Sequence, residues 1–99
     1  MSIGQLNLIH PKEILREEFM APLDLSTHAL SLALRVPATR IGEIVRGRRS
    51  ISADTALRLG RYFGTSPDLW LGLQAEYDLR LAQRKLGVKV EREVQPRVA

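Results

Sequence analysis

The sequence has no cysteine among its 99 residues, which excludes disulfide bridges and thiolate metal sites. Its two histidines, His10 and His28, lack any metal-ligand spacing, and a structural zinc needs about four ligands. We therefore expect no metal and no cofactor. No apolar run approaches the roughly 20 residues of a membrane span, and the chain does not begin with the basic region and long apolar stretch of a signal peptide. These absences predict a soluble, cytoplasmic protein that does not contact a membrane.

The arrangements typical of enzymes are also missing. The chain has no pairing of a nucleophile with a base, no glycine-rich phosphate loop and no carboxylate pair opposite a histidine. We therefore expect that it is not an enzyme. Its length fits a single domain over residues 1–99, and a content of 44% hydrophobic and 26% charged residues is typical of a globular chain.

Positive charge is concentrated in one part of the sequence. The window from Arg35 to Arg49 holds five arginines and a single acidic residue, Glu43, so its net charge equals the +4 of the whole chain. A positive patch of this kind is the electrostatic footprint expected of a protein that binds a phosphate backbone. On charge alone, a solvated basic loop agrees with the pattern equally well.

The chain carries a start signal for a helix at five places. Proline is tolerated at the first helical position, and serine is a favoured N-cap. A residue before proline is disfavoured in α geometry, and glycine commonly ends a helix. Gly47 is expected to end the third helix in this way, because glycine can take the left-handed conformation. No segment alternates long enough with the period of two that a strand requires. The predicted helices begin at Pro11, Ser26, Pro37, Ser52 and Pro67, and the last and longest ends at Leu86, before a tail at 88–99 that is weakly ordered unless a partner holds it.

Residues 26–46 form a predicted helix-turn-helix, because two helices joined by a turn of about three residues must change direction abruptly. An apolar seam joins the two helices, and their outer faces are polar. In this motif the start of the second helix reads base edges in the major groove, while the first helix crosses the DNA backbone. The seam consists of Ala29, Leu30, Ala33, Val36, Ile41 and Ile44.

The polar side chains of this motif can each be given a role in DNA binding. Arg40 can make a bidentate contact to guanine O6 and N7, and Glu43 can accept from a cytosine amine. The start of the first helix favours a phosphate, and arginines after the second helix suit backbone charge. Single exposed residues are weak evidence, so the prediction depends on the conjunction of spacing, turn and charge. The predicted DNA-binding residues are Ser26, Thr27, Pro37, Ala38, Thr39, Arg40, Glu43, Arg46, Arg48 and Arg49.

The stretch STHALSLALRVPATRIGEIVRGRRS resembles the helix-turn-helix of phage-repressor-like (XRE) regulators. The wider segments IHPKEILREEF, ISADTALRLGRYFGTSP and DLWLGLQAEYDLRLA resemble the HigA-type antitoxins of bacterial toxin–antitoxin pairs, over about residues 9–86. The predicted fold class is accordingly all-α. It is a five-helix, phage-repressor-like helix-turn-helix domain whose longer C-terminal helix, 67–86, serves dimerisation.

Two positions depart from the repressor pattern. Ser31 stands where a small apolar alanine is usual, a mild change if its hydroxyl finds a backbone carbonyl. Arg35 stands where glycine commonly takes the left-handed conformation of the turn. A residue other than glycine costs about 1–2 kcal/mol there if the geometry is kept. Either the turn is kept with strain, or its shape differs slightly.

A second copy of the chain is an expected partner, because one motif of this size offers few base contacts. Such proteins bind as two-fold dimers whose helices enter successive major grooves. The last helix carries an apolar stripe with tryptophan and tyrosine, residue types that anchor interfaces. Trp70 and Leu73 can equally complete the core of the monomer, whereas Tyr77 and Leu81 lie farther out. The predicted dimer interface consists of Leu69, Trp70, Leu73, Tyr77 and Leu81.

The leading hypothesis is a sequence-specific DNA-binding antitoxin that represses its own operon and neutralises a ribonuclease-type toxin. Its partners are then double-stranded operator DNA in its own promoter and a small basic toxin, the latter implied by the resemblance alone. The acidic residues Glu13, Glu17 and Glu18 can meet such a toxin by charge complementarity or can face water. The alternative is a free-standing XRE-family transcriptional regulator without a toxin. A third hypothesis is a protein-interaction module that uses the last helix and has no salt-sensitive affinity for DNA.

Overall fold

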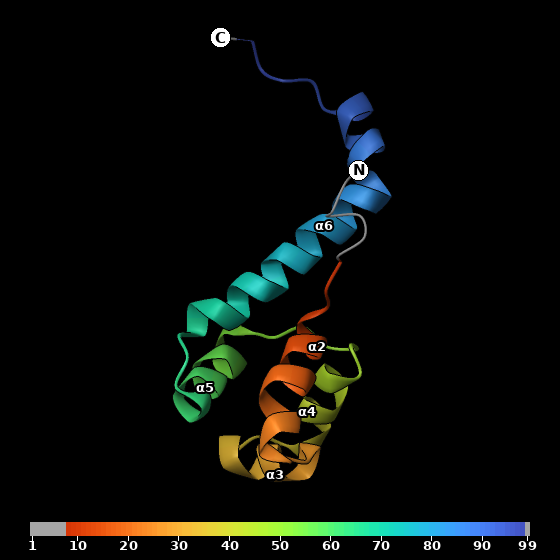
Figure 1. Ribbon diagram of the computed structural model, residues 1–99. Helices are drawn as coiled ribbons and strands as arrows, with labels where there is room; N and C mark the ends of the chain where they lie inside the picture. The colour runs from red at the N-terminus through yellow and green to blue at the C-terminus, as the bar shows by residue number, and fades with distance from the viewer. Residues whose placement is uncertain (1–7, 99) are drawn as a thin grey trace.

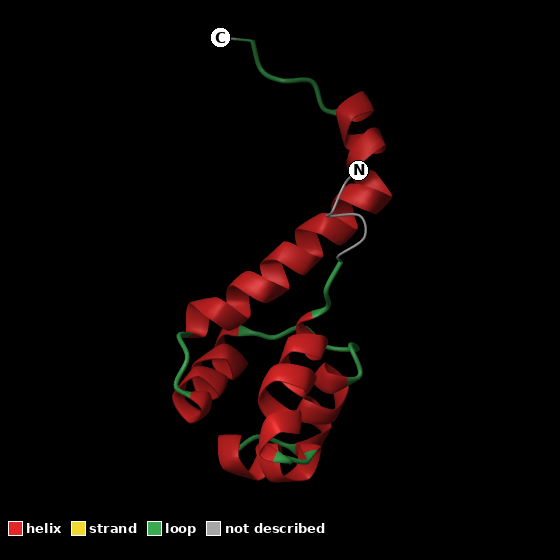
Figure 2. Cartoon of the chain, viewed as in Figure 1, coloured by secondary structure: helices red, strands yellow, loops and turns green. Residues whose placement is uncertain are grey.

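The computed structural model describes residues 8–98, and every regular element within this range is helical (Figures 1 and 2). Residues 1–7 of the predicted domain and Ala99 of the predicted tail lie outside it. The all-α class is confirmed. No helix in the described range has the length and apolar character needed to cross a bilayer. The elements are α2 (Pro11–Ile14), a π-helical turn (Leu15–Met20), a 3-10 turn (Ala21–Leu23), α3 (Thr27–Leu34), α4 (Ala38–Val45), α5 (Ala53–Phe63) and α6 (Pro67–Glu93).

The first helical segment begins with a capping box that was not predicted from the sequence. Nδ1 of His10 accepts a hydrogen bond from the amide of Lys12 at 3.2 Å, and the carboxylate of Glu13 accepts one from the amide of His10 at 3.3 Å. These contacts satisfy two polar groups that the start of a helix leaves without partners. The segment continues through the π and 3-10 turns and ends at Asp24, whose φ of 51° is left-handed.

A single core joins the helices. Trp70 of α6 is 0% exposed, and its ring lies against those of Phe19 and Phe63, with centroids 4.9 and 6.3 Å away. Its indole Nε1 donates to Thr65 Oγ1 at 2.8 Å, so the polar atom of this buried ring is satisfied. The other buried hydrophobic residues of the core are Leu15, Met20, Leu30, Leu34, Ile41, Ile44, Ile51, Ala56 and Leu59.

The last helix is longer than predicted. We expected it to end at Leu86, but α6 continues through Gly87 to Glu93. A glycine inside a helix costs about 1 kcal/mol relative to alanine, which does not by itself end a helix that its neighbours favour. The helix ends ahead of Pro96, where α geometry becomes unfavourable, and Val94 is already extended with φ −110° and ψ 114°. As a result, the C-terminal half of α6 projects beyond the bundle (Figure 1).

The backbone of α5 at Gly60 lies very close to the segment that begins α6. A Cβ added at this position would lie 2.8 Å from Thr65 O and 3.2 Å from Pro67 N, which are backbone atoms that cannot easily move away. We expect Gly60→Ala to lower the free energy of unfolding by about 1–3 kcal/mol, measured by urea denaturation. The matched change Gly72→Ala, which has open space around it, should raise that free energy by about 0.5–1 kcal/mol. A Gly60→Ala protein as stable as Gly72→Ala would contradict this packing.

Candidate nucleic-acid interface

The turn between α3 and α4 has the geometry of a helix-turn-helix. Ser26 caps α3 as predicted, because its Oγ accepts from the amide of Ala29 at 3.0 Å. The helix ends at Arg35, which takes a left-handed conformation with φ 60° and ψ 44°. Of the two alternatives for this turn, the structure shows the first. The turn is kept, and Arg35 carries a strain of about 1–2 kcal/mol that glycine would avoid.

The buried seam of this motif differs from the prediction at one position. Ser31 is buried, and its hydroxyl donates to the carbonyl of His28 at 2.6 Å, so the serine has the backbone partner it needs. Ala33, expected in the seam, is exposed. Leu30, Ser31 and Leu34 together turn one side of α3 to the core, and position 33 falls outside that side.

One apolar side fixes the orientation of α4. Ile41 and Ile44 are fully buried, so the opposite side of this helix faces outward. Ala38 and Thr39 are exposed in its first turn. Pro37 is the N-cap and not the first helical residue, because its ψ of 144° is extended, so α4 starts one residue later than predicted.

Three arginines lie at the end of α4 and in the loop that follows. Gly47 takes the left-handed conformation predicted for it, with φ 76°, and ends the helix. The guanidinium of Arg46 folds back along α4, where a Cβ on Gly42 would meet its Nη1 at 3.1 Å. Arg46, Arg48 and Arg49 are all exposed, which leaves their charges accessible to phosphates.

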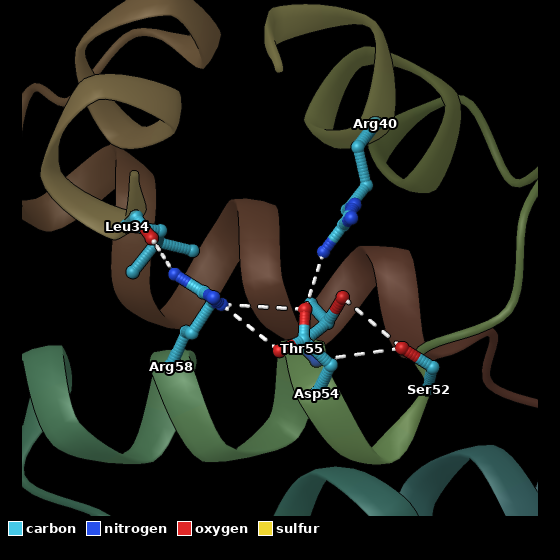
Figure 3. A network of polar contacts seen from close by, with 6 residues as sticks. All are labelled: Leu34, Arg40, Ser52, Asp54, Thr55 and Arg58. Carbon is cyan, nitrogen blue, oxygen red and sulfur yellow. Dashed lines mark hydrogen bonds and ion pairs between the residues drawn. The ribbon is translucent and has the colours of Figure 1, made fainter. Parts of the chain in front are cut away.

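The two side chains of α4 predicted to read bases both have partners within the chain. Glu43 Oε1 lies 3.1 Å from Arg49 Nε. Arg40 points toward the start of α5, where its Nη1 donates to Asp54 Oδ2 at 2.6 Å (Figure 3). The Arg40 side chain is 27% exposed, so it is accessible but not free.

Asp54 holds a second arginine as well. Nε of Arg58 donates to both carboxylate oxygens, at 3.1 and 3.2 Å, and its Nη1 donates to the carbonyl of Leu34 at 2.9 Å (Figure 3). Hydrogen bonds from Arg40, and then from Arg58, hold the pKa of Asp54 below its ordinary value of 3.8. The carboxylate therefore stays charged at neutral pH.

Gln74 of α6 binds the end of the loop between α4 and α5, residues 46–52, which we call the arginine loop. Its Oε1 accepts from the buried amide of Ile51 at 2.9 Å, and its Nε2 donates to Asp78 Oδ1 at 3.0 Å. Leaving that amide without a partner would cost about 1–3 kcal/mol. The roles of Asp54, Arg58 and Gln74 were not predicted from the sequence. Each has a partner at least 14 residues away, and no local spacing signals such a contact.

Trp70 was predicted to lie in the dimer interface, but the structure places it in the core. It is completely buried within one chain and cannot touch a second copy, because the inner side of α6 packs on the core of its own subunit. Leu73 also packs against that core, and Tyr77 lies over the ring of His10 with centroids 4.3 Å apart. Of the predicted interface residues, Leu69 is exposed and Leu81 is half-buried.

A different apolar stripe runs along the outer side of α6. Its members recur every three or four residues, the spacing of one helix face. Its largest side chains are exposed, with Leu79 at 54% and Leu86 at 48%. We call this set the outer stripe, and it consists of Leu71, Ala75, Leu79, Ala82, Leu86 and Val90.

Comparison with known proteins agrees with this geometry. A helix-turn-helix family model matches residues 15–70. Virulence-associated protein I of Dichelobacter nodosus is 55% identical over 81 residues, which make up 82% of this chain and 75% of that protein. Among solved structures, the Pseudomonas aeruginosa antitoxin HigA with the higBA promoter is 49% identical and has a TM-score of 0.89, over 93% of this chain and 100% of the other. A HigA-family addiction module antidote protein from Coxiella burnetii is 47% identical with a TM-score of 0.86, over 92% and 99% of the two chains.

The family model covers more than half of the chain, so the fold and its exposed arginine face define a helix-turn-helix protein. Within that class, nearly half of the aligned residues are identical to those of HigA proteins over almost the entire chain. The chain therefore belongs to the HigA antitoxin family. This assignment agrees with the prediction that the protein is not an enzyme.

We expect His10 to make the stability of the fold depend on pH. Burial, and next the charge of Lys12, lower its pKa below the ordinary value of 6.5, while the charge of Glu13 opposes this shift. The unfolded chain therefore takes up the proton more readily than the folded chain, so stability is full above about pH 6.5 and falls as the pH decreases below it. We expect the urea midpoint to be lower at about pH 5.5 than at about pH 7.5.

The replacement His10→Asn should flatten this pH profile, because asparagine retains a capping oxygen and does not titrate. His28→Asn is the matched control at an exposed position. If His10→Asn kept the full pH dependence of the native chain, another group would be responsible.

Proposed function

We propose that the chain is a sequence-specific DNA-binding antitoxin that binds an operator in its own promoter, represses its operon and neutralises a ribonuclease-type toxin. One observation carries the proposal: the exposed, arginine-rich face of a helix-turn-helix in a chain that is 49% identical to an antitoxin described with its promoter. The protein would act in the cytoplasm, where that DNA lies.

The first turn of α4 is proposed to enter the major groove, where the exposed Thr39 can reach a base or a phosphate oxygen. Arg40 reads a guanine, and Glu43 accepts from a cytosine amine. The free amides at the start of α3 and the arginines after α4 contact phosphates. The proposed DNA-binding surface is Ser26, Thr27, Pro37, Ala38, Thr39, Arg40, Glu43, Arg46, Arg48 and Arg49.

The active form is proposed to be a homodimer joined through the outer stripe of α6. Two recognition helices must be held about 34 Å apart to enter successive major grooves, and a single chain carries one such helix. The outer stripe supports this interface because its leucines are exposed and lie on one side of a helix that projects from the bundle (Figure 1). Leu69 lies at the start of the same helix. Trp70 is excluded from the proposed interface because it is fully buried within one chain.

The toxin half of the proposal rests on family membership. The exposed Glu17 and Glu18 on the first helical segment offer a negative surface that a basic toxin would complement. Glu13 is already engaged in the capping box, so it is the least available of the three acidic residues first considered.

Co-expression with the adjoining reading frame, followed by affinity capture and a gel shift on the upstream DNA, tests the proposal as a whole. A captured small basic protein together with a shifted duplex supports the antitoxin. A shift without a captured partner leaves a free-standing regulator, and the absence of both leaves a protein-interaction module.

Arg40 and Arg48 should differ in what they contribute to DNA binding. Arg40→Ala should weaken binding to the operator by about 1–3 kcal/mol and relax specificity at one base pair, because it removes a base contact. Arg48→Ala should weaken binding to every duplex similarly and reduce the salt dependence by about one phosphate contact. Affinity titrations on operator and random duplexes at several salt concentrations measure both. Equal effects of both variants on both duplexes would show that α4 does not read sequence.

The dimer is tested on the outer stripe. The double variant Leu79→Asp with Leu86→Asp should sediment as a monomer, because each charge would have to be buried in the interface. Its circular dichroism should stay helical, since both side chains are exposed. Leu57→Asp on α5, which replaces a leucine that is 60% exposed, is the matched control and should remain dimeric. If the double variant also sedimented as a dimer, the interface would lie elsewhere.

A further inference from the structure

Asp54 is an acidic residue at the edge of the most positive part of the chain. Its negative charge opposes the attraction of this face for a phosphate backbone. Its side chain is 52% exposed, so it does not neutralise a buried charge. Ion pairs this exposed contribute little to stability. Attraction to DNA does not account for a carboxylate at this place, and its position in the first turn of α5 accounts only for a modest stabilisation of that helix.

The hydrogen bonds of Asp54 explain why a carboxylate stands at this position. They join the two helices of the motif across its turn: Arg40 comes from α4, and Arg58 carries the connection to the carbonyl of Leu34 at the end of α3 (Figure 3). The guanidinium of Arg40 is thus held from outside its own helix. This contact favours one orientation, before DNA arrives, of a long side chain that would otherwise sample many rotamers.

We propose that Asp54 is a positioning residue that determines DNA specificity, because it holds the Arg40 guanidinium in one orientation relative to the bases of the major groove. This inference rests on the proposed function and adds to it a residue that does not itself touch a base. Asp54 engages Arg40 through Nη1. A bidentate contact can use the edge formed by Nε and Nη2, so Arg40 can meet a guanine while it keeps its carboxylate partner.

Loss of the carboxylate has two effects that point in the same direction for specificity. Arg40 becomes free to pair with any nearby acceptor, so the guanine contact weakens. One negative charge also disappears from the DNA-facing side, so attraction to any duplex increases. Both effects lower the ratio between the affinities for operator and for unrelated DNA.

The test compares Kd values for two duplexes, measured by fluorescence anisotropy at several salt concentrations. One is the upstream segment that the wild-type protein protects in a footprint, and the other is a scrambled duplex of the same length. Asp54→Asn should weaken binding to the upstream segment roughly tenfold or more, with unchanged or tighter binding to the scrambled duplex. Asp54→Glu, which keeps the charge but moves the carboxylate by one methylene, should lose part of the same preference.

The chain offers a closely matched control in Asp68. Asp54 and Asp68 are each the second residue of a helix capped by a serine, so both replacements by asparagine remove the same charge from the same helix position. Asp68→Asn should leave the preference between the duplexes unchanged. In an Arg40→Ala background, Asp54→Asn should not weaken binding to the upstream segment further, because the residue it positions is gone.

The outcomes separate this inference from the function on which it rests. A wild-type protein that does not distinguish the two duplexes overturns the proposed function and the role of Asp54 together. If the wild type distinguishes them, the role of Asp54 alone is overturned by either of two results. One is that Asp54→Asn changes both affinities by the same factor, and the other is that it weakens operator binding equally with and without Arg40.

Discussion

The burial of one side of α4 is the constraint on which the rest of this structure depends. Ile41 and Ile44 enter the same core as Trp70, and exposing either isoleucine would cost about 1.5–3 kcal/mol. The helix therefore cannot rotate, and its other side faces outward together with the arginine loop. The seam with α3 and the left-handed turn at Arg35 then set the angle at which α4 is presented. This packing arrangement therefore determines which side chains of α4 are exposed and can contact DNA.

Two acidic residues pair with arginines on the basic face. Glu43 lies against Arg49, and Asp54 lies between Arg40 and Arg58. Each pair lowers the local positive charge, and each also restricts the side chain of an arginine. A face built only for attraction would carry neither carboxylate. Their presence fits a surface that must distinguish one sequence from many, for which orientation matters more than charge.

The two ends of α6 serve different purposes. Its first half supplies Trp70 to the core and Gln74 to the amide of Ile51, at the end of the arginine loop. Its second half projects from the bundle (Figure 1). Its apolar side chains Leu79, Leu86 and Val90 are exposed. A single continuous helix thereby connects the proposed dimer contact to the arginine loop, which is the geometry needed to hold two motifs at a fixed separation.

Much of this protein was predictable from local signals. The sequence determined the helical class, the serine caps, the turn between α3 and α4, and the left-handed Gly47, because caps and turns act on backbone groups only a few residues away. It also located the arginine cluster. Only the tertiary structure decided that α6 continues past Gly87, that Trp70 is buried in the core, and that Arg40 binds Asp54. These outcomes depend on which surfaces meet in space and on the sum of neighbouring preferences, and the spacing of residues along the chain encodes neither.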